Sequence, residues 1–212
     1  KLYLSKTLNL IGENASLFNT TIVVNAPNWL IEGFTIINNG SSDKNCNQWG
    51  IYVFEADEAI IVGNNIMVWD KNTSYAIYLC DSYGSVVTDN YLRAQGDNLV
   101  FTLLNYEAYE TVFENNDIVA VGTSELYPYF ESICIDGVHS ISELSKTYGV
   151  ILDFSSDNQF IHNNVYVTST VEGFQIPYQP SVNILIGLYI YYASNRNNIS
   201  ENNFLIEGHD PF

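Results

Sequence analysis

Short apolar runs recur along the chain, and most of them carry an asparagine at a fixed place. Each copy has an apolar residue, usually Asn three positions later, and another apolar or aromatic residue two positions after that. The copies are Ile61/Asn64/Ile66, Val87/Asn90/Leu92, Phe113/Asn116/Ile118, Ile161/Asn164/Tyr166 and Ile199/Asn202/Phe204, with Ile31/Phe34/Ile36 as an imperfect first copy. Asn64, Asn90 and Asn116 follow one another at intervals of 26 residues. Such a fixed period predicts a repeat architecture.

A second apolar run precedes most copies and often begins with a small residue. Such runs span 50–54, 76–80, 149–152 and 187–191. They are rich in β-branched and aromatic residues and are bounded by Gly, Asn, Asp and Ser, which favours short strands over helices. A unit of roughly 20 to 26 residues with two or three strands closes its own turn by coiling. The sequence therefore predicts an all-β solenoid, a parallel β-helix of about eight coils.

The recurring asparagines have a mechanical explanation. Asn tolerates the left-handed backbone conformation of a sharp bend, and its amide can hydrogen-bond to the backbone or to the Asn of the next coil. Stacked amides would then form a ladder along the solenoid. The predicted ladder consists of Asn64, Asn90, Asn116, Asn164 and Asn202.

These runs resemble a known group of repeats. Residues 50–53, followed by 60–66, are similar to the right-handed parallel β-helix repeats of the pectate-lyase-like superfold, especially the NosD-type repeats. The richness in Asn and Tyr and the acidity further resemble adhesin-like surface proteins of methanogenic archaea. The pattern covers about residues 22–206. The resemblance implies a right-handed coil, but that superfold includes both enzymes and catalytically silent adhesins.

Composition and charge limit the partners. The repeat is continuous, so residues 1–212 are expected to form one domain, which we interpret as a segment of a longer surface protein. The formal charge is −17, which disfavours nucleic acid and anionic membranes as partners. No apolar run is long enough to span a membrane, so no membrane insertion of this segment is expected. The expected location is extracellular or at the cell surface.

The cysteines and histidines show no cofactor motif. Three cysteines cannot form a disulfide framework; Cys80 and Cys134 are expected in the core and Cys46 in a polar loop. His139, His162 and His209 have no metal-ligand spacing. No metal or cofactor is therefore predicted from these residue types.

The signatures of enzymes with this fold are incomplete. A lyase-like site would need an arginine beside a carboxylate cluster, and neither Arg93 nor Arg196 is obviously placed so. A hydrolase would pair aspartates with further His and Arg motifs, of which only partial echoes occur near His139 and His209. We expect no catalysis. A polysaccharide lyase or epimerase with a site around Asp136 and His139 remains the alternative.

Three irregular segments occur at the same phase of the repeat, at 38–49, 121–148 and 171–182. In a solenoid, such insertions project from one edge, which is commonly the binding side. Aromatic rings and carboxylates together suit a glycan or a protein partner. The same rings could instead be buried over the sheet. The binding candidates are Trp49, Tyr127, Tyr129, Phe130, Asp136, Tyr148, Phe174 and Tyr178.

An acidic line is expected at the turn between the two main strands. It consists of Glu55, Asp57, Glu58, Asp81, Glu107, Glu110, Asp153 and Asp157. Carboxylates stacked about 4.8 Å apart must splay into water or share a cation, so calcium stays open as a ligand. Asn39 and Asn72 lie in glycosylation sequons between strands.

The predicted function is that of a rigid, non-catalytic module of an adhesin-like surface protein. The loop-bearing edge would bind a glycan or a surface protein. A purely structural role, in which copies associate into a filament or surface layer, is the second alternative.

Overall fold

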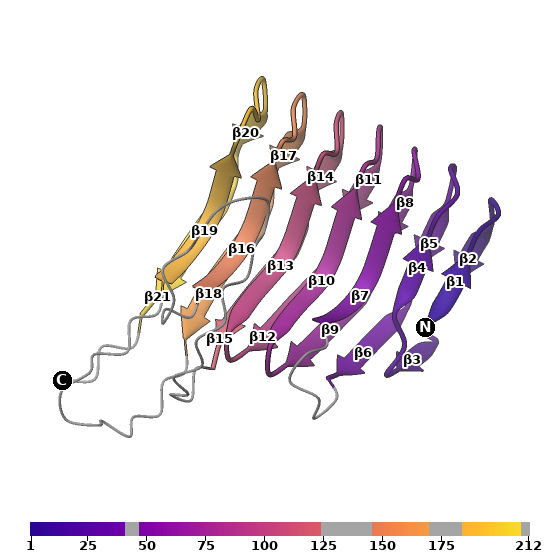
Figure 1. The fold of residues 1–212 in the computed structure, drawn as a ribbon, viewed down its shortest axis with the longest axis horizontal. Helices are drawn as coiled ribbons and strands as arrows, with labels where there is room; N and C mark the ends of the chain where they lie inside the picture. Colours follow the sequence, from indigo (N-terminus) through magenta and orange to yellow (C-terminus); the bar gives the residue numbers. More distant parts are fainter. Residues whose placement is uncertain (41–46, 124–145, 170–183, 209–212) are drawn as a thin grey trace.

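The computed structural model describes residues 1–40, 47–123, 146–169 and 184–208, and these residues form strands, turns and bends without a helix. The strands lie in three sheets of seven, and every third strand along the chain belongs to the same sheet (Figure 1). All strand pairs are parallel. This arrangement is a parallel β-helix, as the repeats predict. The described part of the chain has no helix that could cross a membrane.

The first sheet contains the longest strands. Its members are β1 (Leu2–Leu4), β4 (Ile22–Val24), β7 (Asn47–Phe54), β10 (Thr73–Cys80), β13 (Leu99–Tyr106), β16 (Lys146–Asp153) and β19 (Ile184–Tyr191). The second sheet contains β2 (Asn9–Ile11), β5 (Leu30–Glu32), β8 (Ile60–Val62), β11 (Val86–Thr88), β14 (Val112–Glu114), β17 (Gln159–Ile161) and β20 (Asn198–Ser200). The third contains β3 (Ser16–Phe18), β6 (Thr35–Asn39), β9 (Asn65–Asp70), β12 (Tyr91–Gly96), β15 (Asp117–Gly122), β18 (Asn164–Ser169) and β21 (Asn203–Glu207).

The described strands make seven coils, whereas the sequence predicted about eight. Strand β13 pairs directly with β16, and β16 pairs directly with β19. The first sheet is therefore continuous from β13 to β19. Residues 41–46, 124–145 and 170–183 connect a strand of the third sheet to a strand of the first; they lie outside the described residues. The right-handed sense of the coil remains a prediction.

The core is built of columns of equivalent side chains, one from each coil. In the first sheet, Ile22, Ile51, Ile77, Leu103 and Val150 are in register and are completely buried. In the second sheet, Ile61, Val87, Phe113 and Phe160 form a similar buried column. Because each coil buries the apolar surface of its neighbour, the hydrophobic core is continuous along the stack.

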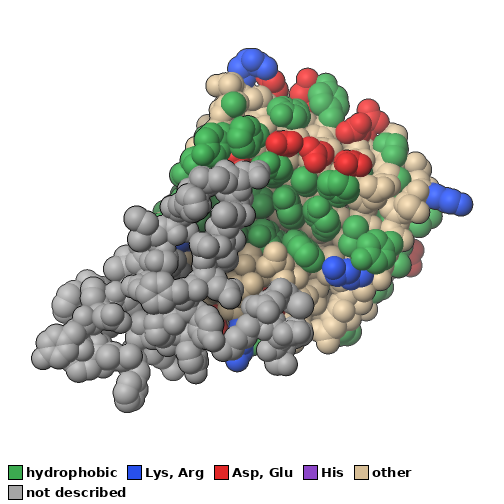
Figure 2. All heavy atoms as spheres, viewed as in Figure 1, with side chains coloured by type: hydrophobic (Ala, Val, Ile, Leu, Met, Phe, Trp, Pro, Cys, Tyr) green, Lys and Arg blue, Asp and Glu red, His purple; other side chains and the backbone are tan. Residues whose placement is uncertain are grey.

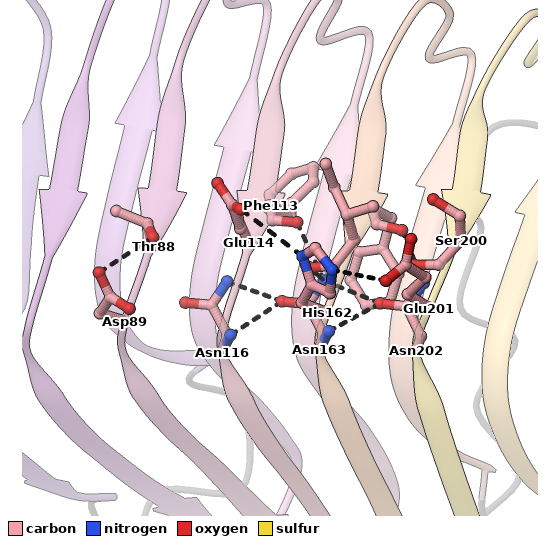
Figure 3. A network of polar contacts seen from close by, with 12 residues as sticks. Thr88, Asp89, Phe113, Glu114, Asn116, His162, Asn163, Ser200, Glu201 and Asn202 are labelled. Atoms are coloured by element: carbon pink, nitrogen blue, oxygen red, sulfur yellow. Dashed lines mark hydrogen bonds and ion pairs between the residues drawn. The ribbon is translucent and has the colours of Figure 1, made fainter.

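An asparagine ladder runs along the corner between the second and third sheets. Each side-chain amide donates to Oδ1 of the next Asn, with distances of 3.1, 3.0, 2.9 and 3.1 Å. The backbone N–H of each residue donates to the same Oδ1 atom. The members are Asn64, Asn90, Asn116, Asn163 and Asn202, of which Figure 3 shows the last three.

The structure corrects one member of the predicted ladder. Asn164 is exposed, and its Nδ2 donates to Oδ1 of Asp117 at 2.8 Å, while Asn163 occupies the ladder. The pattern was aligned on Ile161, but the completely buried residue of this strand is Phe160. The Asn three residues after Phe160 is Asn163, in agreement with the spacing in the other coils.

The left-handed corner residue also differs from the prediction. The ladder asparagines do not have positive φ; the residue before each one does. In successive coils these residues are Gly63, Asp89, Asn115, His162 and Glu201, with φ between 54° and 63°. The bend therefore precedes the ladder position, which leaves the Asn side chain free to point into the corner.

Candidate functional site

The outer face of the first sheet carries a column of aromatic residues because its strands break the simple alternation at one position. Gly50 and Ile51 are both buried, so Trp49 and Tyr52 on either side of them point outward. A Cβ atom added to Gly50 would meet Ile66 and would lie 2.6 Å from the carbonyl oxygen of Ala76. The small residues that begin these runs thus make room for the close approach of the sheets.

The rings of four successive coils stack on one another. Ring centroids are 6.2 Å apart between Trp49 and Tyr75, 5.1 Å between Tyr75 and Phe101, and 5.3 Å between Phe101 and Tyr148. Their planes are within 21° of parallel. Such offset stacks stabilise neighbouring coils beyond the burial of area alone. The ammonium of Lys1 lies 4.9 Å from the centroid of the Trp49 ring.

A second, shorter column lies beside the first. Tyr52 and Tyr78 stack at 5.0 Å, and each also stacks sideways on the first column, Tyr52 on Trp49 at 5.7 Å and Tyr78 on Tyr75 at 5.5 Å. We call the two columns together the aromatic band. Its members are Trp49, Tyr52, Tyr75, Tyr78, Phe101 and Tyr148.

Exposure differs among the members of the aromatic band. Tyr75, Phe101 and Tyr148 are 7%, 4% and 9% exposed, whereas Trp49, Tyr52 and Tyr78 are half-buried. Ring faces in the first column contact other rings, so they are not free to stack on a sugar. The half-buried members are the ones whose ring edges and phenol groups solvent can reach.

The phenols of the band stay protonated. Burial, followed by the charges of Cys80, Asp81 and Glu55, raises the pKa of Tyr52 to about 12. Burial is also the main cause of the raised pKa of Tyr78. Both hydroxyl groups are therefore neutral hydrogen-bond donors at physiological pH. Burial likewise raises the pKa of the Cys80 thiol to about 12, so this cysteine is not a reactive thiolate.

A row of acidic side chains follows the edge of this face. Glu55, Asp81 and Glu107 occupy equivalent positions immediately after β7, β10 and β13, each with φ near 50°. Figure 2 shows acidic side chains in a row beside the hydrophobic surface. In the next coil Phe154 takes this position, because Asp153 pairs with Tyr106 inside the strand. Asp153 therefore does not belong to the acidic line that the sequence predicted.

Three other members of that predicted line, Glu58, Glu110 and Asp157, belong to a separate column three residues later in the turn, whereas Asp57 lies outside both columns and accepts a hydrogen bond from the backbone N–H of Tyr83. Backbone hydrogen bonds align Glu58, Gly84, Glu110, Asp157 and Arg196. The guanidinium of Arg196 binds Asp157 through Nε and Nη2, at 2.6 and 2.5 Å. This contact lowers the pKa of Asp157. The two carboxylates that precede Asp157 are separated by a glycine, so they do not form an unbroken acidic stack.

One histidine joins two carboxylates from neighbouring coils (Figure 3). Nε2 of His162 lies 2.9 Å from Glu201, and Nδ1 lies 3.6 Å from Glu114. The hydrogen bond to Glu201 is the largest cause of the raised pKa of His162. No group of three or more ligating side chains suited to a metal ion occurs in the described ranges.

Most predicted binding candidates lie outside the described residues: Tyr127, Tyr129, Phe130, Asp136, Phe174 and Tyr178. Four cysteines and histidines discussed above also lie outside them: Cys46, Cys134, His139 and His209. Of the candidates, Trp49 and Tyr148 are described, and both belong to the aromatic band. The predicted binding candidates did not include Tyr52, Tyr75, Tyr78 and Phe101. The 26-residue spacing of Trp49, Tyr75 and Phe101 is the signal that could have found them.

The two glycosylation candidates differ in accessibility. Asn39 is exposed at the end of β6, whereas Asn72 is partly buried between β9 and β10 and its Oδ1 accepts a hydrogen bond from Nδ2 of Asn98. The arginines do not form a lyase-like site within the described part of the chain. Arg93 donates to Gln95, and Arg196 binds one carboxylate, that of Asp157.

No protein-family model matches the chain, and neither the curated proteins nor the solved structures contain a match.

Proposed function

We propose that this chain is a rigid, non-catalytic module of an adhesin-like cell-surface protein and that it binds a glycan through the outer face of the first sheet. The observation that carries the proposal is the meeting of phenols and carboxylates on one face. Burial is the largest cause of the raised pKa of Tyr52, and the charges of Cys80, Asp81 and Glu55 add to it. Phenol donors and carboxylate acceptors on one face suit a ligand with many hydroxyl groups.

The scaffold favours presentation of a face over chemistry. The rings of the aromatic band are fixed by stacking, and the sheet below them is in register with the core. A rigid aromatic surface with polar tips binds at a low cost in conformational entropy. Because the ring faces contact one another, we assign recognition to ring edges, phenols and the row Glu55, Asp81 and Glu107.

The net charge of the chain supports the proposed location at the cell surface. The chain carries a formal charge of −17, which keeps a surface protein dispersed and repels anionic polymers. Neutral or basic glycans are therefore the expected ligands. The similarity of the repeats to NosD-type β-helices and to archaeal adhesin-like proteins agrees with this role.

A glycan array and calorimetry with the bound glycan would test the proposal. We expect the double variant Tyr52→Phe, Tyr78→Phe to bind at least about tenfold more weakly, since two hydrogen bonds are lost while the ring stack is kept. The matched control is Tyr83→Phe, Tyr109→Phe, at an exposed corner outside the aromatic band. Unchanged binding by the first variant would remove the proposed face.

Two further outcomes would contradict the proposal. If the chain shortens the glycan or releases unsaturated sugars, the role is catalytic. If it binds a surface protein and no glycan, with binding that survives loss of both phenols, the face is an apolar protein-docking surface.

A further inference from the structure

Three carboxylates form a row beside the aromatic band, one in each of three successive coils. We call Glu55, Asp81 and Glu107 the acidic row. The backbone N–H of Glu55 donates to the carbonyl oxygen of Cys80, and that of Asp81 to the carbonyl oxygen of Tyr106, so the turns lie over one another. Each residue of the row has φ of 49° or 50°, which directs the three side chains alike. Since neighbouring strands are about 4.8 Å apart, the row runs along the axis of the solenoid.

The acidic row has no cation of its own within the described part of the chain. The ion pairs found there involve Glu114, Asp157 and Glu201, which belong to other columns. Glu55 and Asp81 are exposed, and Glu107 is half-buried. Carboxylates in successive coils repel one another. A ligand with positive charges at a similar spacing would relieve this repulsion, whereas a neutral ligand would leave it.

The aromatic band gives an independent sign that this face accepts cations. The ammonium of Lys1 lies 4.9 Å from the centroid of the Trp49 ring, a distance at which the ring attracts a positive charge. The outer face of the first sheet thus already holds one ammonium group of the protein itself.

Tyr52 connects the band to the acidic row. Its ring stacks on Trp49 at 5.7 Å, and it precedes Glu55 by three residues. Burial is the largest cause of its raised pKa, and the charges of Cys80, Asp81 and Glu55 add to it. Ring surface, a phenol donor and carboxylate acceptors therefore lie on one continuous surface, which Figure 2 shows as acidic side chains beside the hydrophobic area.

Among glycans, polymers of amino sugars match all three features. Their ammonium groups complement the carboxylates, their hydroxyl groups complement the phenols, and the apolar sides of the sugar rings complement the aromatic surface. The length of a sugar unit in an extended chain is similar to the distance between coils. A chain along the axis therefore reaches successive members of the acidic row, whereas a chain laid across the axis would reach only one.

We propose that the outer face of the first sheet binds a cationic polymer of amino sugars, which lies along the axis of the solenoid with its ammonium groups on Glu55, Asp81 and Glu107. The inference rests on the proposed function, because it names the class of glycan for the same face. Each exposed ion pair is weak, so binding depends on several pairs formed by one ligand chain.

Calorimetry with oligomers of 1,4-linked glucosamine would test the proposal, at a pH below the pKa of the sugar amines. The control ligands are the fully N-acetylated oligomers, which have the same rings and linkage but no charge. We expect the amine oligomers to bind about tenfold more tightly, and added salt to remove this difference. Affinity should rise with length until the oligomer spans the row, at about three sugar units, and then level off. Equal affinity for the charged and the acetylated oligomers would overturn the proposal.

Neutralising the acidic row locates the binding. The triple variant Glu55→Gln, Asp81→Asn, Glu107→Gln should bind the amine oligomers about tenfold more weakly and the acetylated oligomers as the wild type does. Its matched control removes three exposed charges of the same sign from other parts of the solenoid: Glu32→Gln, Asp89→Asn, Asp117→Asn. An equal loss in both triple variants would show attraction by net charge alone and would overturn the assignment to the row.

The same measurements separate this proposal from that of glycan binding in general. If another, uncharged glycan binds and the binding requires the phenols of Tyr52 and Tyr78, the amino-sugar proposal is wrong and the proposed function stands. If no glycan binds, both are wrong.

Discussion

Asn163 donates a hydrogen bond of 3.1 Å from its side-chain amide to Oδ1 of Asn202, one coil away. The same Nδ2 also donates to the carbonyl oxygens of Phe113 and Ile161. One amide thus satisfies backbone groups at the corner of its own coil and of the preceding coil. Because the corner is buried, water cannot replace these bonds, which makes the ladder a structural requirement of the stack.

The first prediction compares neighbouring asparagines. Asn163→Ala should lower the free energy of unfolding by ~3 kcal/mol or more, since it leaves buried N–H and carbonyl groups without partners at ~1–3 kcal/mol each. Asn164→Ala removes one exposed hydrogen bond, to Asp117, and should cost at most ~1 kcal/mol. Urea unfolding followed by circular dichroism measures both. A larger loss for Asn164→Ala would contradict the ladder assignment.

The fold could be predicted because the sequence shows both the length of the coil and the strands within it. The 26-residue spacing gives the coil, and the apolar runs give strands of the first and third sheets. The register at Asn164 could not be fixed because Phe160 and Ile161 are both apolar, and periodicity alone does not say which one points inward. The position of the left-handed residue failed similarly, since Asp89, Asn115 and Glu201 give no single residue type to recognise.

The candidate site was less predictable than the fold. The sequence predicted the binding aromatic residues in the irregular segments, whereas the described aromatic band lies on regular strands. Its members point outward because Gly50 and the equivalent Ala76 are buried together with the residues that follow them. The outward direction of these rings depends on the packing of the third sheet against the first. The strand pattern of a single coil does not reveal that packing.

The second prediction concerns that close packing. Gly50→Ala would bring a methyl group against Ile66 and the backbone of Ala76, and should cost ~1–3 kcal/mol through overpacking. Gly63→Asn is the matched control: a Cβ there meets nothing within 4 Å, and its φ of 63° is one that Asn tolerates. We expect a loss below ~1 kcal/mol for the control. Thermal unfolding of both variants would decide, and equal losses would contradict the packing argument.

The third prediction is a pH dependence centred on His162. Its pKa is raised above the ordinary value of 6.5, chiefly by the hydrogen bond to Glu201, with Glu114 adding to the effect. The folded protein therefore binds this proton more tightly than the unfolded chain does. The stabilisation is fully present below the unfolded pKa and is lost as the pH rises through the folded pKa.

Melting temperatures measured at pH values from below the unfolded pKa to above the folded pKa of His162 would test the role of this histidine. In His162→Asn, which keeps a residue suited to the left-handed corner, the fall in melting temperature with rising pH should be smaller. Glu32→Gln, at the place in an earlier coil that corresponds to Glu114 but without a histidine neighbour, should keep the dependence of the wild type. An unchanged profile in His162→Asn would exclude His162 as the titrating group.

The last prediction concerns Asp70, a completely buried carboxyl group. Its Oδ1 accepts a hydrogen bond of 2.6 Å from the backbone N–H of Asn72, while Oδ2 faces Gly40 and has no hydrogen-bond partner among the residues that the structure describes. Burial raises the pKa of Asp70, and the charge of Asp97 adds to this, although backbone N–H groups of Asn72 and Thr73 act in the opposite direction. The ionised form is therefore the one that the fold disfavours.

Because the folded pKa of Asp70 lies above its unfolded value of 3.8, stability should fall as the pH rises from that value through the folded pKa. Asp70→Asn keeps the acceptor for Asn72 and removes the buried charge, so it should be more stable than the wild type at pH 7, with the difference shrinking as the pH falls toward about 4. Asp89→Asn, at an exposed corner, removes a charge of the same sign from solvent and should leave this slope in place. Urea unfolding at several pH values would measure the slopes of stability against pH. If the wild type is more stable than Asp70→Asn at pH 7, the carboxylate is bound by a favourable partner.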